Sequence, residues 1–143
     1  MATTRSSTKA SSAGEPGLSL WLVPPEGSDV YKVLTKAINE VVPDEMDASD
    51  FVPSFEPHIT LASRIPRQSV TSDPQEWLDG IDLPEISSVE VRWHELAVGD
   101  AYHKRLFVRC KRSDSLLQLA SSCRAFSSAN AGEAQYDPHV SLL

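Results

Sequence analysis

Two five-residue segments of the chain carry a histidine and a hydroxyl residue at the same spacing. They read Pro-His-Ile-Thr-Leu at residues 57–61 and Pro-His-Val-Ser-Leu at residues 138–142. In an extended strand, side chains two positions apart point to the same face. Each segment would therefore present an imidazole, His58 or His139, beside a hydroxyl, Thr60 or Ser141. The residue between them would turn into the core.

Two imidazoles and two hydroxyls around one cavity could perform acid–base chemistry on a phosphate without a metal ion. A single His-x-Thr on a strand is most often only a polar position near a sheet edge. Here, however, two of the chain's four histidines occur in the same context. We therefore predict that His58 and His139 are catalytic, that Thr60 and Ser141 bind the substrate, and that no metal or cofactor is needed.

The bulk composition limits the class of protein and the kind of partner. A chain of 143 residues, 41% hydrophobic and 23% charged, is typical of one globular domain. Its formal charge is −7, and no cluster of Lys and Arg is visible, which argues against binding long nucleic acid. A small phosphorylated substrate remains compatible with this charge, and we expect a monomer.

The remaining global features are few. No apolar run reaches the length of a membrane span. Residues 1–17, rich in Ser, Thr and Ala at the start, are predicted to be a flexible tail ahead of one domain over residues 18–143. Cys110 and Cys123 lack metal-ligand spacing and a disulfide framework, which favours packed, reduced thiols in a cytoplasmic protein.

Hydrophobic periodicity predicts the elements that must position the two segments. Strands are expected over residues 18–23, 58–64, 89–94, 106–110 and 138–142, the third and fourth joined as a hairpin through Gly99 and Asp100. Helices are expected from Ser28 to Pro43, from Asp73 to Gly80, and from Ser113 or Asp114 onward. This order favours an α+β fold with two similar lobes facing each other across a groove.

The predicted helices have apolar stripes that would face the core. The stripe of the longest one is formed by Tyr31, Leu34, Ile38 and Val41. Trp77 and Leu78 would face inward from the short helix. The inner side of the last helix would carry Leu116, Leu117, Ala120 and Cys123.

The paired segments resemble the 2H phosphoesterase superfamily, which is named for two His-x-Thr/Ser motifs. Four further stretches resemble its fungal and plant cyclic nucleotide phosphodiesterase branch: residues 19–25 (Ser-Leu-Trp-Leu-Val-Pro-Pro), 55–58 (Phe-Glu-Pro-His), 75–79 (Gln-Glu-Trp-Leu-Asp) and 106–110 (Leu-Phe-Val-Arg-Cys). The resemblance covers the chain from about residue 18 to its end.

The resemblance implies a bilobal fold with two antiparallel sheets around a central groove. It implies hydrolysis of 2′,3′-cyclic nucleotides to 2′-phosphates, and of ADP-ribose 1″,2″-cyclic phosphate, a by-product of tRNA splicing. It also implies that His139 is the base and His58 the acid, and that an association with the Golgi is an alternative to the cytoplasm. Family members usually continue beyond the second motif, so the C-terminal strands are expected to be missing here.

Several residues near the expected groove have two interpretations. Trp21 either stacks on a nucleobase or packs in the core. By the resemblance, Tyr102 and His103 would sandwich the base, and the alternative is an ordinary exposed turn. Lys104 and Arg105 either make the mouth of the groove positive or belong to a solvated hairpin, whereas His94 is expected on the surface.

Two other functions remain open at this point. One is a module that binds cyclic-phosphate or RNA ends without turnover, and the other is an RNA 3′-end processing enzyme with the same chemistry. A metal hydrolase is disfavoured because His-x-Thr strands do not offer three converging ligands.

Overall fold

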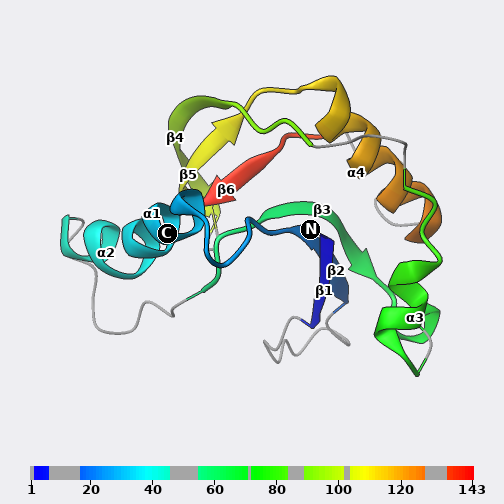
Figure 1. Ribbon diagram of the computed structural model, residues 1–143. Coiled ribbons are helices and arrows are strands. Elements are labelled where there is room, and N and C mark those ends of the chain that lie inside the picture. The colour runs from blue at the N-terminus through cyan, green and yellow to red at the C-terminus, as the bar shows by residue number, and fades with distance from the viewer. Residues whose placement is uncertain are drawn as a thin grey trace.

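The computed structural model describes residues 2–6, 17–45, 55–70, 72–83, 89–101, 104–127 and 135–143. Antiparallel strands and helices are mixed along the chain, as expected of an α+β fold (Figure 1). The elements are β1 (Ala2–Ser6), β2 (Leu18–Leu22), α1 (Asp29–Lys36), the π-helical turn η1 (Ala37–Val41), α2 (Val42–Glu45), β3 (Ile59–Ile65), the 3-10 turn η2 (Arg67–Ser69), α3 (Pro74–Asp79), β4 (Trp93–Ala101), β5 (Lys104–Cys110), α4 (Asp114–Ser127) and β6 (His139–Ser141).

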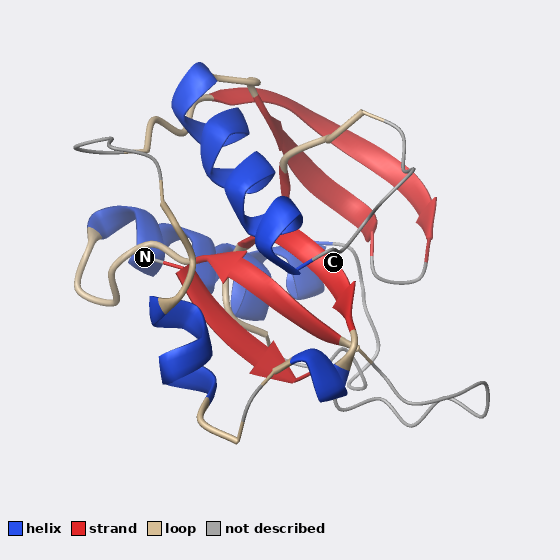
Figure 2. Ribbon diagram, turned by 90° about the vertical axis from the view of Figure 1, so that its right-hand side faces the viewer, coloured by secondary structure: helices blue, strands red, loops and turns tan. Residues whose placement is uncertain are grey.

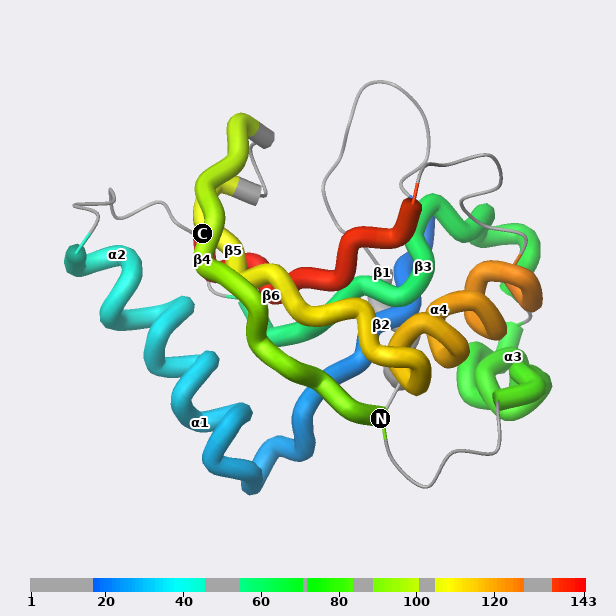
Figure 3. Tube along the Cα trace, turned by 90° about the horizontal axis from the view of Figure 1, so that it is seen from above, coloured from blue at the N-terminus to red at the C-terminus, as the bar shows by residue number. Residues whose placement is uncertain are grey.

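The described strands form one antiparallel sheet in the order β1-β2-β3-β6-β5-β4. Strand β6 runs between β3 and β5 (Figure 3). Its pairing with β3 consists of one register pair, Ile59 with Val140. The two sheets expected from the sequence are therefore joined in the structure, because this pair links the β1-β2-β3 half to the β6-β5-β4 half.

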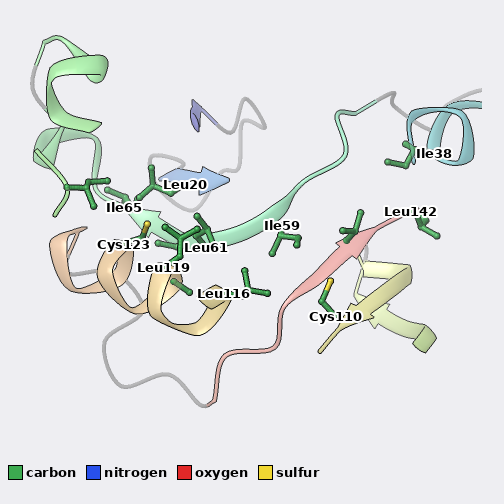
Figure 4. Close-up of a cluster of buried hydrophobic side chains, with 14 of the residues drawn as sticks. Leu20, Ile38, Ile59, Leu61, Ile65, Cys110, Leu116, Leu119, Cys123 and Leu142 are labelled. Atoms are coloured by element: carbon green, nitrogen blue, oxygen red, sulfur yellow. The ribbon is translucent and has the colours of Figure 1, made fainter. Parts of the chain in front are cut away.

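The helices and one face of the sheet share a single apolar core. Figure 4 shows side chains from α4 and β3 meeting, with Ile38 and Leu142 farther along the same cluster. The buried members are Leu20, Ile38, Val42, Ile59, Leu61, Ala62, Ile65, Trp77, Ile81, Cys110, Leu116, Leu119, Ala120, Cys123, Val140 and Leu142. Since Ile59 and Val140 point into this core, the residues flanking them in each strand point to the opposite face.

Local sequence signals explain where the helices begin. Ser28 caps α1 by accepting a hydrogen bond from the amide of Tyr31 at 3.2 Å. Asp73 caps α3, because its carboxylate accepts hydrogen bonds from the backbone amides of Gln75 and Glu76. Helix α4, seen in Figure 2, begins after Ser113, whose hydroxyl accepts the amide of Leu116 at 3.4 Å.

The helix predicted from Ser28 to Pro43 is interrupted rather than ended by its proline. Pro43 has no amide hydrogen and cannot continue the ordinary i to i−4 ladder. The preceding turn, η1, is π-helical, and the amide of Val42 donates to the carbonyl of Ala37. The wider turn shifts the buried stripe by one residue. Val42 is consequently buried, whereas Val41, predicted on the stripe, is 45% exposed.

The other helices follow the predicted stripes with one change. Trp77 is buried and Leu78 half-buried in α3. In α4, Leu116, Ala120 and Cys123 are buried as predicted, but Leu119 is buried where Leu117 is only half-buried.

The hairpin is shifted along the sequence relative to its prediction. Residues 89–92 lie outside the strand, and β4 begins at Trp93. Gly99 and Asp100, predicted in the turn, lie within β4, which pairs with β5 as far as Ala101 with Lys104. Thus the strand extends beyond the glycine, and a register shift between Val98 and Ala101 accommodates it.

Part of the predicted N-terminal tail is a strand. Residues 2–6 form β1, which pairs with β2 from Ala2 with Leu22 to Ser6 with Leu18. The β-branched residues Thr3 and Thr4 favour an extended chain, and β2 would otherwise present unpaired backbone groups at this edge.

Candidate active site

Strand β3 carries the first motif and is shaped by β-bulges. Leu20 pairs with Ala62 while Trp21 pairs with Thr60, so Leu61 is an extra residue opposite β2. Both Leu61 and Ala62 are buried although they are consecutive. Alternation from Ile59 turns Leu61 into the core and leaves His58 and Thr60 half-buried on the other face, and the bulge lets Ala62 face the core as well.

Strand β6 brings the second motif beside the first. The antiparallel pair Ile59–Val140 aligns His58 with Ser141 and Thr60 with His139 on the face away from the core. All four side chains are half-buried and remain accessible from solvent. The register thus brings both imidazoles and both hydroxyls of the sequence prediction together on one side of the sheet.

The two imidazoles are oriented in the same way. The Nδ1 of His58 lies 2.7 Å from the carbonyl oxygen of Glu56, and the Nδ1 of His139 lies 2.8 Å from that of Asp137. A carbonyl oxygen only accepts, so each Nδ1 carries the proton. The other nitrogen, Nε2, is left as the atom that accepts a proton in the neutral ring and donates one in the cation.

Each imidazole also contacts an aromatic ring from the neighbouring strand. The ring of Trp21 stacks on His58, with centroids 3.7 Å apart and planes 12° apart. The ring of Phe107 meets His139 edge to face, with centroids 5.4 Å apart. Trp21 is opposite Thr60 and Phe107 is opposite Ser141, so the two halves of the site repeat one arrangement.

Trp21 does not pack in the core, and its interpretation as a residue that stacks on a nucleobase stays a prediction. It is half-buried on the face away from the core, and the described residue against which its ring stacks is His58. Its contact restrains an imidazole, which the residue types alone did not predict.

A charged group lies beside the second motif. Arg109 is opposite His139 in the ladder and forms ion pairs with Glu95 at 2.7 Å and Asp137 at 3.4 Å. Hydrogen bonding by Glu95, followed by the charge of Asp137, raises the pKa of Arg109 above its ordinary value. The guanidinium also lies 5.4 Å from the ring centroid of Phe107. This side of the site therefore carries a permanent cation with two carboxylate partners.

The remaining site candidates predicted from the sequence either lie away from the two motifs or fall outside the residues that the structure describes. Tyr102 and His103 fall outside the described residues, as does the side chain of Lys104. Arg105 is exposed, and His94 is exposed on β4 as predicted.

The surrounding space has two further properties. Among the described residues, no group of three or more His, Cys, Asp or Glu side chains is arranged to hold a metal ion. An apolar cavity of about 370 Å³ lies between α1 and residues 89–93, and its described lining includes His58 and Val140 but not Thr60, His139 or Ser141.

In the described ranges, each helix is too short or too polar to cross a bilayer.

Four residues of the site were missed by sequence reasoning: Phe107, Arg109, Arg124 and Tyr136. Phe107 and Tyr136 contact the motifs from positions that read as ordinary strand and loop residues, and Arg124 reads as a solvated helix residue. Because Phe107 lies between Leu106 and Val108, strand alternation predicts that it points to the opposite face from them. Its contact with His139 could not be predicted, because that residue belongs to a strand more than 30 residues away.

Comparison with known proteins adds to this geometry. A family model described as cyclic phosphodiesterase-like protein matches residues 16–143. A Neurospora crassa protein named 2′,3′-cyclic-nucleotide 3′-phosphodiesterase is 32% identical, with 90% of this chain and 70% of the relative covered. A protein of the same name from Phaeosphaeria nodorum is 30% identical, with 90% and 68% covered. One from Yarrowia lipolytica is 27% identical, with 89% and 72% covered.

Proposed function

The chain belongs to the cyclic phosphodiesterase-like protein family, and from this premise we propose that it hydrolyses 2′,3′-cyclic nucleotides to nucleoside 2′-phosphates. The observation that carries the proposal is the Ile59–Val140 register, which aligns two His and hydroxyl pairs on one accessible face. The names of the fungal relatives support the substrate class.

The two histidines divide the proton transfers. His139 accepts a proton from water at Nε2, and the resulting hydroxide attacks phosphorus. The bond between phosphorus and the ribose 3′ oxygen breaks, and His58 delivers its Nε2 proton to that oxygen. The product is a 2′-phosphate with a free 3′ hydroxyl, and the proton on His139 returns to His58 through solvent before the next turnover.

The contact with Trp21 restrains the ring of His58. The indole lies parallel to the imidazole with centroids 3.7 Å apart, so it limits rotation of the ring that delivers the proton. The hydrogen bonds to the carbonyls of Glu56 and Asp137 hold both Nε2 atoms in one orientation.

The hydroxyls of Thr60 and Ser141 bind the two non-bridging phosphate oxygens. Negative charge grows on these oxygens as the five-coordinate transition state forms, and donors placed there stabilise it. No step in this scheme uses a metal ion.

ADP-ribose 1″,2″-cyclic phosphate is a second substrate under the same proposal. It contains a five-membered cyclic phosphate on adjacent ribose hydroxyls, so the same two proton transfers open it. The binding-module and RNA 3′-end alternatives use the same face but differ in product.

The test is product analysis with adenosine 2′,3′-cyclic phosphate in the presence of a chelator. We expect the 2′-phosphate from the unaltered chain and from the His94→Ala control, which removes an exposed histidine on β4. His58→Ala and His139→Ala should each lose most turnover, at least about 100-fold, while retaining binding. Binding without any product would favour the non-catalytic module, and near-normal rates in both histidine variants would reject the mechanism.

A further inference from the structure

The backbone ladder between the two motif strands is short. Strand β6 pairs with β5 at three positions, from Phe107–Ser141 to Arg109–His139, but with β3 only at Ile59–Val140. The proposed reaction needs both imidazoles at fixed distances from one phosphorus atom. One register pair leaves β6 able to pivot, so other contacts must hold the two strands together.

Two side chains bind adjacent carbonyls of β3 next to the first motif. The hydroxyl of Tyr136 donates to the carbonyl of Thr60 at 2.7 Å, and Nε of Arg124 donates to the carbonyl of Leu61 at 3.1 Å. Leu61 is the extra residue of the bulge, so its carbonyl lies where the ladder is interrupted. Both contacts therefore occur at the end of β3 that carries the catalytic hydroxyl.

The two side chains also contact each other. The guanidinium of Arg124 lies 4.6 Å from the ring centroid of Tyr136, a cation–π distance. Arg124 belongs to α4, whose inner face is in the core, whereas Tyr136 lies three residues before His139. The pair thus connects the helix, the first motif strand and the segment that leads into the second.

The chemistry of the phenol suits a permanent brace. Burial raises the pKa of Tyr136 well above its ordinary value, against an opposing effect from the charge of Arg124. The hydroxyl stays protonated at any pH at which histidines titrate, and its carbonyl partner can only accept. The hydroxyl of Tyr136 therefore donates this hydrogen bond throughout the reaction and takes no part in proton transfer.

We propose that Tyr136, supported by Arg124, is a positioning residue that fixes the His139 strand against the His58 strand during hydrolysis. The inference rests on the proposed function, because it assigns the brace to that reaction. A displacement of about 1 Å between catalytic groups can lower a rate roughly 100-fold. Losing the hydroxyl should therefore lower kcat much more than it weakens substrate binding.

The test compares Tyr136→Phe with Tyr31→Phe, a matched loss of a phenol hydroxyl from α1. With adenosine 2′,3′-cyclic phosphate, Tyr136→Phe should lower kcat about 10- to 100-fold and change KM less than about threefold. One acid and one base give a bell-shaped pH–rate curve, and both limbs of that curve should remain, since the phenol is not an acid or base of the reaction. Arg124→Lys, which keeps the charge but loses the Nε donor, should show the same split with a smaller effect.

A second measurement does not depend on turnover. Amide hydrogen exchange in β6 should be at least about tenfold faster in Tyr136→Phe, with α4 and the β4–β5 hairpin unchanged, because a released strand opens locally. If the unaltered chain shows no turnover, the proposed function fails, and exchange alone decides whether the brace exists. A kcat within about twofold of the unaltered chain, loss of one pH limb, or unchanged exchange in β6 would overturn the positioning role.

Discussion

Replacing Trp21 by leucine separates two roles that an aromatic residue can have at this site. The indole lies 3.7 Å from the imidazole of His58 with nearly parallel planes. Aromatic pairs contribute about 0.5–1.5 kcal/mol beyond their buried area, and a cation over an aromatic face about 0.5–2 kcal/mol. If that energy holds the imidazole of His58 in its reactive orientation, its loss lowers kcat roughly 2- to 30-fold, since about 1.4 kcal/mol is tenfold in rate.

The assay uses two substrates that differ only in the base. Adenosine 2′,3′-cyclic phosphate carries a nucleobase, and ribose 2′,3′-cyclic phosphate does not. A residue that acts through His58 lowers kcat by the same factor with both substrates. Phe126→Leu, at an aromatic side chain that is 40% exposed on α4 and contacts Trp77, is the control and should leave kcat unchanged. A rise in KM confined to the nucleotide, with kcat intact, would refute the account and show that Trp21 stacks on the base.

Three further outcomes follow from the described contacts. Burial raises the pKa of the Cys110 and Cys123 thiols from 9.0 to about 11. As the pH rises, these thiols therefore ionise in the unfolded chain before they ionise in the folded one. The free energy of unfolding should consequently fall as pH rises from 9.0 to about 11. Denaturant titrations at pH 8 and pH 11 measure this, and equal stability would contradict it. Leu20→Ala, at a fully buried core position, should lower the free energy of unfolding by about 2–5 kcal/mol in a urea titration. Val33→Ala, at a position that is 67% exposed, should change it little. Equal losses in the two variants would show that the core is assigned wrongly. Hydrolysis should persist after exhaustive treatment with a chelator, and recovery only on adding a divalent metal would oppose the metal-free scheme.

Much of the arrangement around the motifs could be predicted because it depends on short-range periodicity. Alternation in a strand put His58 with Thr60 and His139 with Ser141, and the same rule turned Ile59 and Val140 into the core. The register in which the structure pairs the two strands is a long-range property, so the sequence alone did not determine which hydroxyl lies opposite which histidine.

Other features escaped prediction because they arise from backbone irregularities. The bulge at Leu61 changes which residues face the core, and nothing in the local sequence marks it. The π-helical turn before Pro43 moves burial from Val41 to Val42, where a regular helical period predicts the reverse.

The supporting residues of the site were missed for a third reason. Tyr136 bonds a carbonyl 76 positions away, and Arg124 bonds one 63 positions away. Contacts to backbone atoms leave no pattern of residue types, so their partners become visible only once the chain is folded.

A crystal structure of the chain with adenosine 2′-phosphate, the expected product, tests the central claim most directly. We predict one phosphate on the face of β3 and β6 that points away from the core. Nε2 of both His58 and His139 should lie within about 3.2 Å of phosphate or ribose oxygens, with the hydroxyls of Thr60 and Ser141 on the non-bridging oxygens. A phosphate bound elsewhere, or contacted by one imidazole while the other faces away, would contradict the account.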